Sequence, residues 1–390
     1  MNSPHPETAP RFALWDLGFR PFYLLASVFA ATSVPLWVLQ YAGYLPANYM
    51  RSMVWHGHEM LFGYALAVIT GFLFTAVRNW TGQSTPTGST LAAFALLWIA
   101  GRVLVLTPFE MAAALVNAAF PIAVAVGIGI PMLRSGNRRN YFFLPLLFLL
   151  GLAALSLHLT YMGVFAWPQL ASLQVGLDLV LFIMAVISGR VMPMFTNNAV
   201  PGAGATSKPI LEKLALGSVL ILLAADLFQA PAILIAIVAL LAAGAHAARL
   251  MHWHPWRTAH APLVWILHAA YAWIVVYLLL RALAAAGMVA EPLAVHALTI
   301  GAIGSMTIGM MTRTARGHTG RPLAADGFEQ ACFALIQFAA LSRVLGGLFL
   351  PNVYVATVIF SSVCWSMAFA IYAVRYWPVL TRPRIDGKPG

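Results

Sequence analysis

Histidine is the residue type in this sequence that points most clearly to chemistry. The chain has 11 His against 11 Asp and Glu, and four of the His lie near the same end of three long apolar runs: His56, His58, His158 and His296. Neutral imidazole is the commonest metal ligand among side chains and the form of His that an apolar interior tolerates. Four His at one depth therefore predict a metal centre, although a single such His would more often be polar packing.

The segment His56-Gly57-His58 is the sharpest motif. In a helix, side chains two residues apart point about 200° apart, so these imidazoles would face two centres on opposite sides of one helix. In an extended chain they could instead hold one ion together. Glu59 follows directly and could accept a hydrogen bond from a metal-binding imidazole, which would fix the orientation of the ring. Alternatively, Glu59 is a solvent-exposed capping residue at the outer end of the helix.

A second group lies nearer the other end of the apolar runs. His268 and Tyr271 are three residues apart and share one helix face, and His318 follows a later run. They predict a second, inner metal site with Tyr271 as a candidate catalytic residue, although each alone also fits a structural role. The remaining His at that end stand among Trp and Arg and are expected to be interfacial: His246, His252, His254 and His260.

The ligand types narrow the choice of metal. The two Cys, Cys332 and Cys364, lie inside apolar stretches and predict neither a disulfide framework nor a thiolate site. A His-rich site without thiolates suits haem iron, copper or zinc.

Charged residues supply two further candidates. Five arginines crowd one end of three runs and could hold haem propionates or another anion, although topology alone predicts some of them: Arg78, Arg190, Arg313, Arg316 and Arg321. Asp178 is the one acidic residue that we expect deep inside a run. A carboxyl group there predicts a proton relay, or else one polar link between helices.

The elements that must position these residues are membrane helices. The chain has 390 residues, of which 61% are hydrophobic and 8% charged, and its mean hydropathy is +0.84; a soluble domain carries about a quarter charged residues. The net charge of +11 does not predict nucleic-acid binding, because the Lys and Arg fall in short loops between apolar runs. The first run begins near Phe19 without a cleavable signal pattern, so we expect it to stay in the lipid bilayer.

Twelve apolar runs are long enough to cross a bilayer and predict an all-α polytopic protein with one transmembrane domain over 1–390. They lie near residues 19–40, 53–77, 89–107, 110–133, 140–163, 168–193, 209–229, 231–251, 260–286, 291–315, 326–350 and 352–377. Eighteen of the 22 Lys and Arg fall on the side that holds both termini. Positive charge marks the cytoplasmic side, so we expect a multi-pass protein of the inner (cytoplasmic) membrane with both termini in the cytoplasm.

An internal repeat relates the runs. With His58 aligned on His296 without gaps, Gly63 meets Gly301 and Arg78 meets Arg316. The run at 168–193 matches this pattern more weakly and has no His at the position of His58. The chain then divides into three units of four helices, roughly 19–133, 140–251 and 260–377, with the second, sixth and tenth runs in equivalent, central positions. If His58 and His296 face each other, they could be the two axial ligands of one haem.

Six segments carry a resemblance to a known family. They are Gly18–Phe22, Trp55–Met60, Thr75–Gly82, Gly189–Asn197, Leu267–Tyr271 and His296–Pro322. With them, nearly the whole chain resembles the NnrS family of haem- and copper-containing membrane proteins linked to nitric oxide response. The resemblance implies haem b, copper and protection against nitrosative stress.

The resemblance leaves the reaction open. A reductase would convert two nitric oxide molecules, two electrons from an unidentified donor and two protons into nitrous oxide and water. The alternative is a non-enzymatic nitric oxide binder or sensor. A transporter is less favoured, because common transporters repeat as two halves of six helices. Haem–copper oxidases and nitric oxide reductases also have three units of four helices, but their usual His arrangement on helices 2 and 10 is the reverse of this one.

Overall fold

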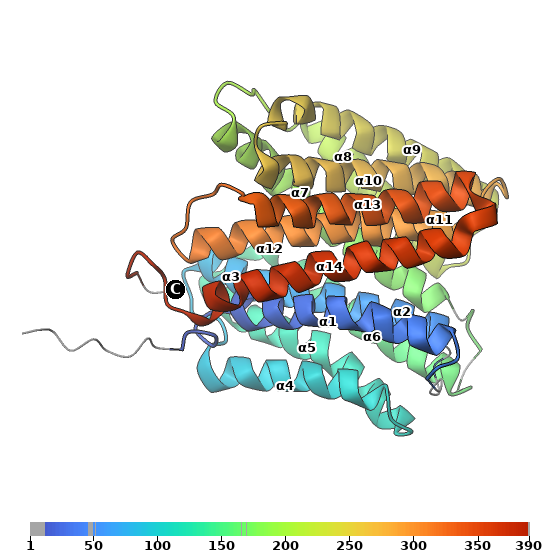
Figure 1. Ribbon diagram of the computed structural model, residues 1–390, viewed down its shortest axis with the longest axis horizontal. Coiled ribbons are helices and arrows are strands. Elements are labelled where there is room, and N and C mark those ends of the chain that lie inside the picture. Colours follow the sequence, from blue (N-terminus) through green and yellow to red (C-terminus); the bar gives the residue numbers. More distant parts are fainter. Residues whose placement is uncertain (1–11, 46–49, 51, 165, 169, 389–390) are drawn as a thin grey trace, which may run out of the picture.

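The computed structural model describes residues 12–45, 50, 52–164, 166–168 and 170–388, and every regular element in these ranges is a helix. Each of the twelve predicted runs coincides with a helical rod (Figure 1). The rods are α1 (Phe19–Tyr41), α2–η1–α3 (Ser52–His58, Glu59–Ala65, Leu66–Thr81), α4 (Gly88–Leu104), α5 (Glu110–Ser135), α6 (Phe143–Tyr161), α7 (Ala171–Ala199), α8 (Pro209–Leu227), α9 (Ala232–Met251), α10 (Pro262–Ala285), α11–η4–α12 (Glu291–His296, Ala297–Gly304, Ser305–His318), α13 (Gly327–Phe349) and α14 (Tyr354–Thr381).

Ten of these rods, counted over the described residues, are long and apolar enough to cross a membrane. The other two are α4 and α8. The first has only 17 residues, and α8 carries Glu212, Lys213 and Asp226 within 19 residues. The chain is therefore an all-helical membrane protein with ten clear candidate spans, and α4 and α8 lie between them.

The second, tenth and sixth rods are the most buried, in line with their predicted central positions. Within the most apolar stretch of each, 83% of residues are buried in Met53–Thr81, 78% in Glu291–His318 and 72% in Ala171–Ala199. The rod α10 follows at 67%, and the outer rods have half or fewer of these residues buried. These central rods carry most of the predicted site residues.

Two of the central rods share a departure from regular α-helix. The π-helical segment η1 begins directly after His58, and η4 begins directly after His296. The two segments coincide in the repeat alignment that superposes these His, whereas α7, which lacks the His, is α-helical throughout. Short π-helical segments are rare and occur often at functional sites.

The described ends of the chain meet at one end of the bundle, where α1 begins and α14 finishes (Figure 1). The Ala13 amide donates to the Thr381 carbonyl at 2.8 Å. The buried Arg20 donates from Nη1 to the Leu380 carbonyl at 3.0 Å and to the Arg382 carbonyl at 2.8 Å. The first and last helices therefore close the bundle on each other.

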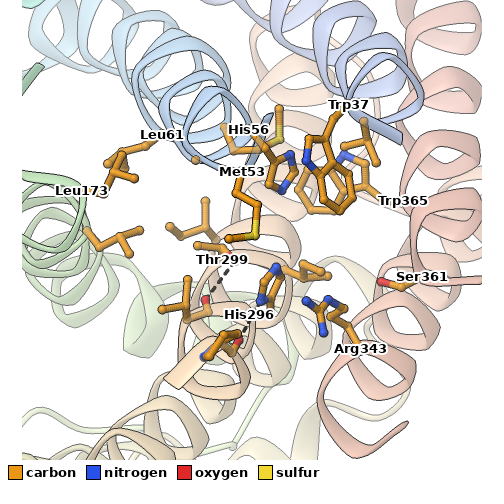
Figure 2. Close-up of a pocket in the computed structure, with 18 of the residues that line it drawn as sticks. Trp37, Met53, His56, Leu61, Leu173, His296, Thr299, Arg343, Ser361 and Trp365 are labelled. Atoms are coloured by element: carbon orange, nitrogen blue, oxygen red, sulfur yellow. Dashed lines mark hydrogen bonds between the residues drawn. The ribbon is translucent and has the colours of Figure 1, made fainter. Parts of the chain in front are cut away.

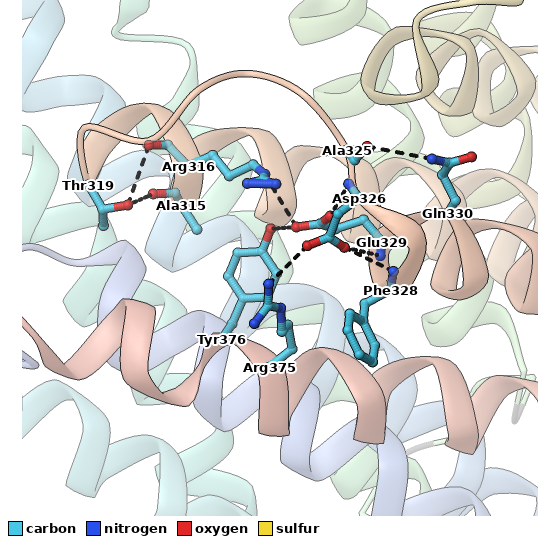
Figure 3. A network of polar contacts seen from close by, with 10 residues as sticks. All are labelled: Ala315, Arg316, Thr319, Ala325, Asp326, Phe328, Glu329, Gln330, Arg375 and Tyr376. Carbon is cyan, nitrogen blue, oxygen red and sulfur yellow. Dashed lines mark hydrogen bonds and ion pairs between the residues drawn. The ribbon is translucent and has the colours of Figure 1, made fainter. Parts of the chain in front are cut away.

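A polar network joins α12, α13 and α14 near the same end (Figure 3). Glu329 pairs with Arg316 at 3.2 Å and accepts from the Tyr376 hydroxyl at 2.7 Å. Asp326 is the N-cap of α13 and pairs with Arg375 at 2.9 Å. A side-chain hydrogen bond with Glu329, together with Arg375 and the backbone N–H groups that Asp326 caps, lowers the pKa of Asp326. The network holds the start of α13 in place.

Candidate functional site

The two His of the His-x-His motif face different surroundings. The segment is α-helical, so the imidazoles diverge as the helical reading predicts. His56 is half-buried and stacks on Trp37, with ring centroids 4.5 Å apart. His58 is fully buried and contacts His158 from α6.

His56 lines a cavity of about 320 Å³ between α1, α2, η1, α7, α11, η4, α13 and α14. Its other polar lining includes His296 and Arg343, and most of the remaining wall is apolar. Figure 2 shows His56 and His296 on either side of Met53, with the Arg343 guanidinium close by. We refer to this cavity as the His56–His296 pocket. Its size lies at the lower end of the range for cofactor sites, about 300–1,000 Å³.

Both imidazoles of the pocket have ring nitrogens available for a ligand. His296 Nδ1 lies 2.6 Å from the Pro292 carbonyl oxygen. Because a carbonyl can only accept, Nδ1 carries the hydrogen and Nε2 keeps its lone pair. This backbone contact is how metal-binding His residues are commonly oriented. The Nδ1 atom of His56 has no hydrogen-bond partner among the described residues.

The second pair of imidazoles lies on the other side of the motif. His58 Nε2 and His158 Nε2 are 3.0 Å apart, and both side chains are fully buried. His58 Nδ1 donates to Glu59 Oε1 at 2.7 Å. Glu59 in turn accepts from Arg102 at 2.5 Å, and Arg102 also contacts Asn117. Glu59 is buried, so it orients His58 and the alternative reading as a solvated cap is wrong.

The four predicted His thus form two pairs and not one cluster. Over the described ranges, no group of three or more His, Cys, Asp or Glu gathers in metal-binding geometry. The predicted pairing of His58 with His296 is also wrong, because His58 faces His158 while His296 shares its cavity with His56. Equivalent backbone positions in a repeat do not make two side chains face each other.

A comparison with protein families decides the identity. A family described as NnrS protein matches residues 13–384, which is nearly the whole chain. The chain belongs to the NnrS family. Membership indicates a membrane protein linked to the nitric oxide response. No curated protein matches the chain.

In this NnrS-family protein the predicted inner group is divided among different partners. His268 Nε2 bonds the Thr196 hydroxyl at 2.8 Å, whereas the His318 ring packs against Phe19. Tyr271 accepts from Arg249 at 2.9 Å and lies 2.7 Å from His246 Nδ1. The structure therefore does not bring His268 and His318 together with Tyr271.

His246 is a correction to the sequence prediction. It was expected to be interfacial, yet it is fully buried between Tyr271 and the Ala215 carbonyl. The expectation failed because His246 stands near a helix end in the sequence, while the neighbouring rods α8 and α10 cover that end. The surrounding Trp and Arg gave no signal of this burial.

The predicted arginine group of the NnrS-family chain lies far from the His56–His296 pocket. Arg78 follows His56 by 22 residues along one rod, which is roughly 30 Å at the rise of a helix. Protein groups already contact three of the others: Asn140 bonds Arg190, the Phe195 ring packs on Arg313, and Glu329 pairs with Arg316. Arg321 lies beyond the same end of its rod. The guanidinium of the pocket is Arg343, which sequence reasoning missed.

Asp178 is fully buried in α7, as predicted, but it is not the only buried acid. Glu59, Asp226 and Glu329 are buried as well. Asp178 Oδ1 accepts from Gln174 Nε2 at 3.0 Å, and Gln174 lines the pocket. Asp226 stands near the end of its apolar run, where the sequence gives no sign of burial. Its burial follows from the packing of α8 against the neighbouring helices.

Proposed function

We propose that this NnrS-family protein binds haem b in the His56–His296 pocket and copper between His58 and His158, and that it captures nitric oxide there. The observation that carries the proposal is the division of the His-x-His motif between two pairs of imidazoles. One helix would thereby hold two metal centres on opposite sides.

The pocket suits haem better than it suits a bare ion. The imidazoles of His56 on α2 and His296 on α11 would hold the iron, and aromatic and aliphatic side chains would form an apolar wall around the porphyrin. Arg343 is 8% exposed and keeps Nη1 without a hydrogen-bond partner among the described residues. A haem propionate would satisfy that donor by a charge-assisted bond.

The His58–His158 pair suits copper. Two imidazole nitrogens 3.0 Å apart can bind one ion, and the site lacks the thiolates that favour other metals. Glu59 holds Nδ1 of His58, which leaves Nε2 as the ligand atom. Arg102 pairs with the buried Glu59 carboxylate at 2.5 Å and balances its charge.

When bound, haem iron and copper supply the binding of nitric oxide and the transfer of electrons to it. The protein's own contribution is an apolar cavity, which admits a small uncharged gas and limits water. Capture at this site would lower free nitric oxide and protect the cell against nitrosative stress. Reduction to nitrous oxide would further require two electrons from a donor and two protons. A non-enzymatic binder or sensor is the alternative.

We also propose that α4 and α8 cross the membrane, giving twelve spans with both termini in the cytoplasm of a bacterial inner membrane. The distribution of Lys and Arg and the meeting of the chain ends support this arrangement. The shared π-helical segments support the repeat of the second and tenth rods, and with it three units of four helices.

The deciding experiment is a haem and metal analysis of purified protein and single variants. His56→Ala and His296→Ala should each lose haem, measured as the pyridine haemochrome, while copper stays. His58→Ala and His158→Ala should each lose copper, measured by elemental analysis, while haem stays. His260→Ala is the matched control, because His260 is exposed and should change neither content.

Either of two results would reject the assignment: wild-type protein without haem and copper, or loss of both groups in every His variant including the control. Nitric oxide consumption with an artificial electron donor then separates the two functional alternatives. Catalytic production of nitrous oxide identifies a reductase, and stoichiometric uptake with no turnover identifies a binder.

A further inference from the structure

A buried charged network lies beside the pocket and plays no part in the metal assignment. It consists of Asp178 on α7, Asp226 on α8, and Tyr277 and Arg281 on α10. Asp178 and Tyr277 are fully buried, and Asp226 and Arg281 are each 7% exposed. Charged groups at this depth are rare and mostly functional.

The contacts within the network leave two carboxyl oxygens without a hydrogen-bond donor. Arg281 Nη2 donates to Asp226 Oδ1 at 2.5 Å. Asp178 interacts with Asp226 across the contact between α7 and α8. Gln174 joins Asp178 to the hydroxyl of Tyr277, which stands one helical turn before Arg281. The second oxygen of each carboxyl, Oδ2, has no other partner among the described residues. Two adjacent carboxylates can only accept, so a proton between them is the donor that these oxygens need.

A charge count gives the same answer. Each of the other buried acids among the described residues has an arginine of its own: Glu59 has Arg102, Glu329 has Arg316 and Asp226 has Arg281. Asp178 has none. The other groups that face the network are Gln174 and Tyr277, which are neutral, and Glu291 at longer range, which is acidic. Two carboxyls beside one guanidinium therefore carry one proton to reach neutrality.

We propose that Asp178 and Asp226 form a carboxyl pair that holds one exchangeable proton beside the His56–His296 pocket, as a proton store for chemistry in that pocket. The use of the proton depends on the proposed function, whereas its presence does not. Gln174 is a positioning residue, because its amide donates to Asp178 Oδ1 and to the Tyr277 hydroxyl and also lines the pocket.

The position of the pair suits proton entry from one end of the bundle. Asp226 stands one residue before the end of α8, and its backbone carbonyl accepts from Gln229 in the following loop. Asp178 lies further inside its helix than Asp226 does, and it is bonded to Gln174, which lines the pocket. A proton passed from the pair to the pocket would be replaced through the carboxyl nearer the loop, so that the charge of the network is restored.

Infrared difference spectroscopy of the purified holoprotein at neutral pH tests the pair without nitric oxide. A protonated carboxylic acid gives a C=O stretching band that shifts in deuterated water. We expect this band in the wild type and its loss in both Asp178→Asn and Asp226→Asn, because either remaining carboxyl would ionise beside Arg281. Asp326→Asn is the control, since Asp326 is ion-paired at the surface and should leave the band unchanged.

Absence of the band in the wild type would overturn the proposal, as would its persistence in Asp178→Asn. If Asp226→Asn fails to fold, Asp178→Asn together with Asp178→Glu decides, because the glutamate should restore the band. A second readout tests the role of the proton: in a protein that reduces nitric oxide, Asp178→Asn should slow turnover with the haem spectrum unchanged. Since the infrared result needs no turnover, a failed proton pair and a failed reductase are distinguishable.

Discussion

Glu59 would support the proposed copper centre without binding the metal. Its Oε1 accepts from both His58 and Arg102, so it fixes the imidazole and is itself held by a buried cation. The carboxylate favours the tautomer with a free Nε2, which would make His58 a better ligand for the proposed copper.

We predict that Glu59→Gln weakens copper binding by about 10–100-fold, because the amide fixes the imidazole less firmly and carries no charge. Competition with a chromophoric copper chelator measures this affinity. Glu110→Gln is the matched control, since Glu110 lies in the first turn of α5 and is not hydrogen-bonded to His58 or His158 in the described part of the chain. Equal copper affinity in the two variants would remove Glu59 from the site. Haem content should be the same in both.

At the residue scale, the sequence predicted that four His lie near one end of three apolar runs, but not which side chains they contact. His56, His58, His158 and His296 were recognisable from their type and depth. Their division into pairs depends on how α2 is rotated against α6 and α11, which hydropathy does not encode. The sequence also did not reveal that Arg281 is a buried ion-pair partner. Arg281 stands near a helix end, and its partner Asp226 is 55 residues away along the chain.

At the scale of elements, glycine permits the close contact between α7 and the arginine of α9. A Cβ on Gly189 would overlap the guanidinium of Arg249 and come close to the carboxylate of Glu212. Arg249 also donates to the Ala185 carbonyl and to Tyr271, so it joins three rods.

We predict that Gly189→Ala destabilises the protein by about 1–3 kcal/mol, the usual cost of overpacking, because Arg249 must move from its partners. Thermal unfolding in detergent should show the lower melting temperature. The helical glycines Gly217 and Gly244 have open space at the Cβ position, so alanine there should leave the melting temperature unchanged or raise it. A Gly189→Ala variant as stable as these controls would show that Arg249 is not held in this position.

The helices themselves were predicted well, because long apolar runs between polar turns leave little choice of boundary. The π-helical segments were not, since one extra residue per turn changes the hydrogen-bond register without changing the apolar pattern. The alignment of His58 with His296 was the only sign in the sequence that the two rods share a special conformation.

At the scale of the whole molecule, the number of spans decides on which side of the membrane each loop lies. With twelve spans, reporter fusions after Gly82, Gly136 and Gly204 should report the cytoplasm, and fusions after Thr107, Gly163 and Gln229 should report the periplasm. The fusions after Gly82 and Thr107 flank α4, and those after Gly204 and Gln229 flank α8. The same signal on both sides of α4 or of α8 would show that this helix does not cross, whereas the opposite signal at all six points would show that both termini lie outside.

The contact between α1 and the end of α14 has a consequence for circular permutation of the protein. Arg20 and Ala13 are bonded to the backbone of residues 380–382, so α1 and α14 pack as neighbours although they are the first and last helices. The order of the helices along the chain can therefore be changed without separating these two. Joining the two termini and opening the chain in the loop near Gly202 would yield a circular permutant with the same neighbours around every rod.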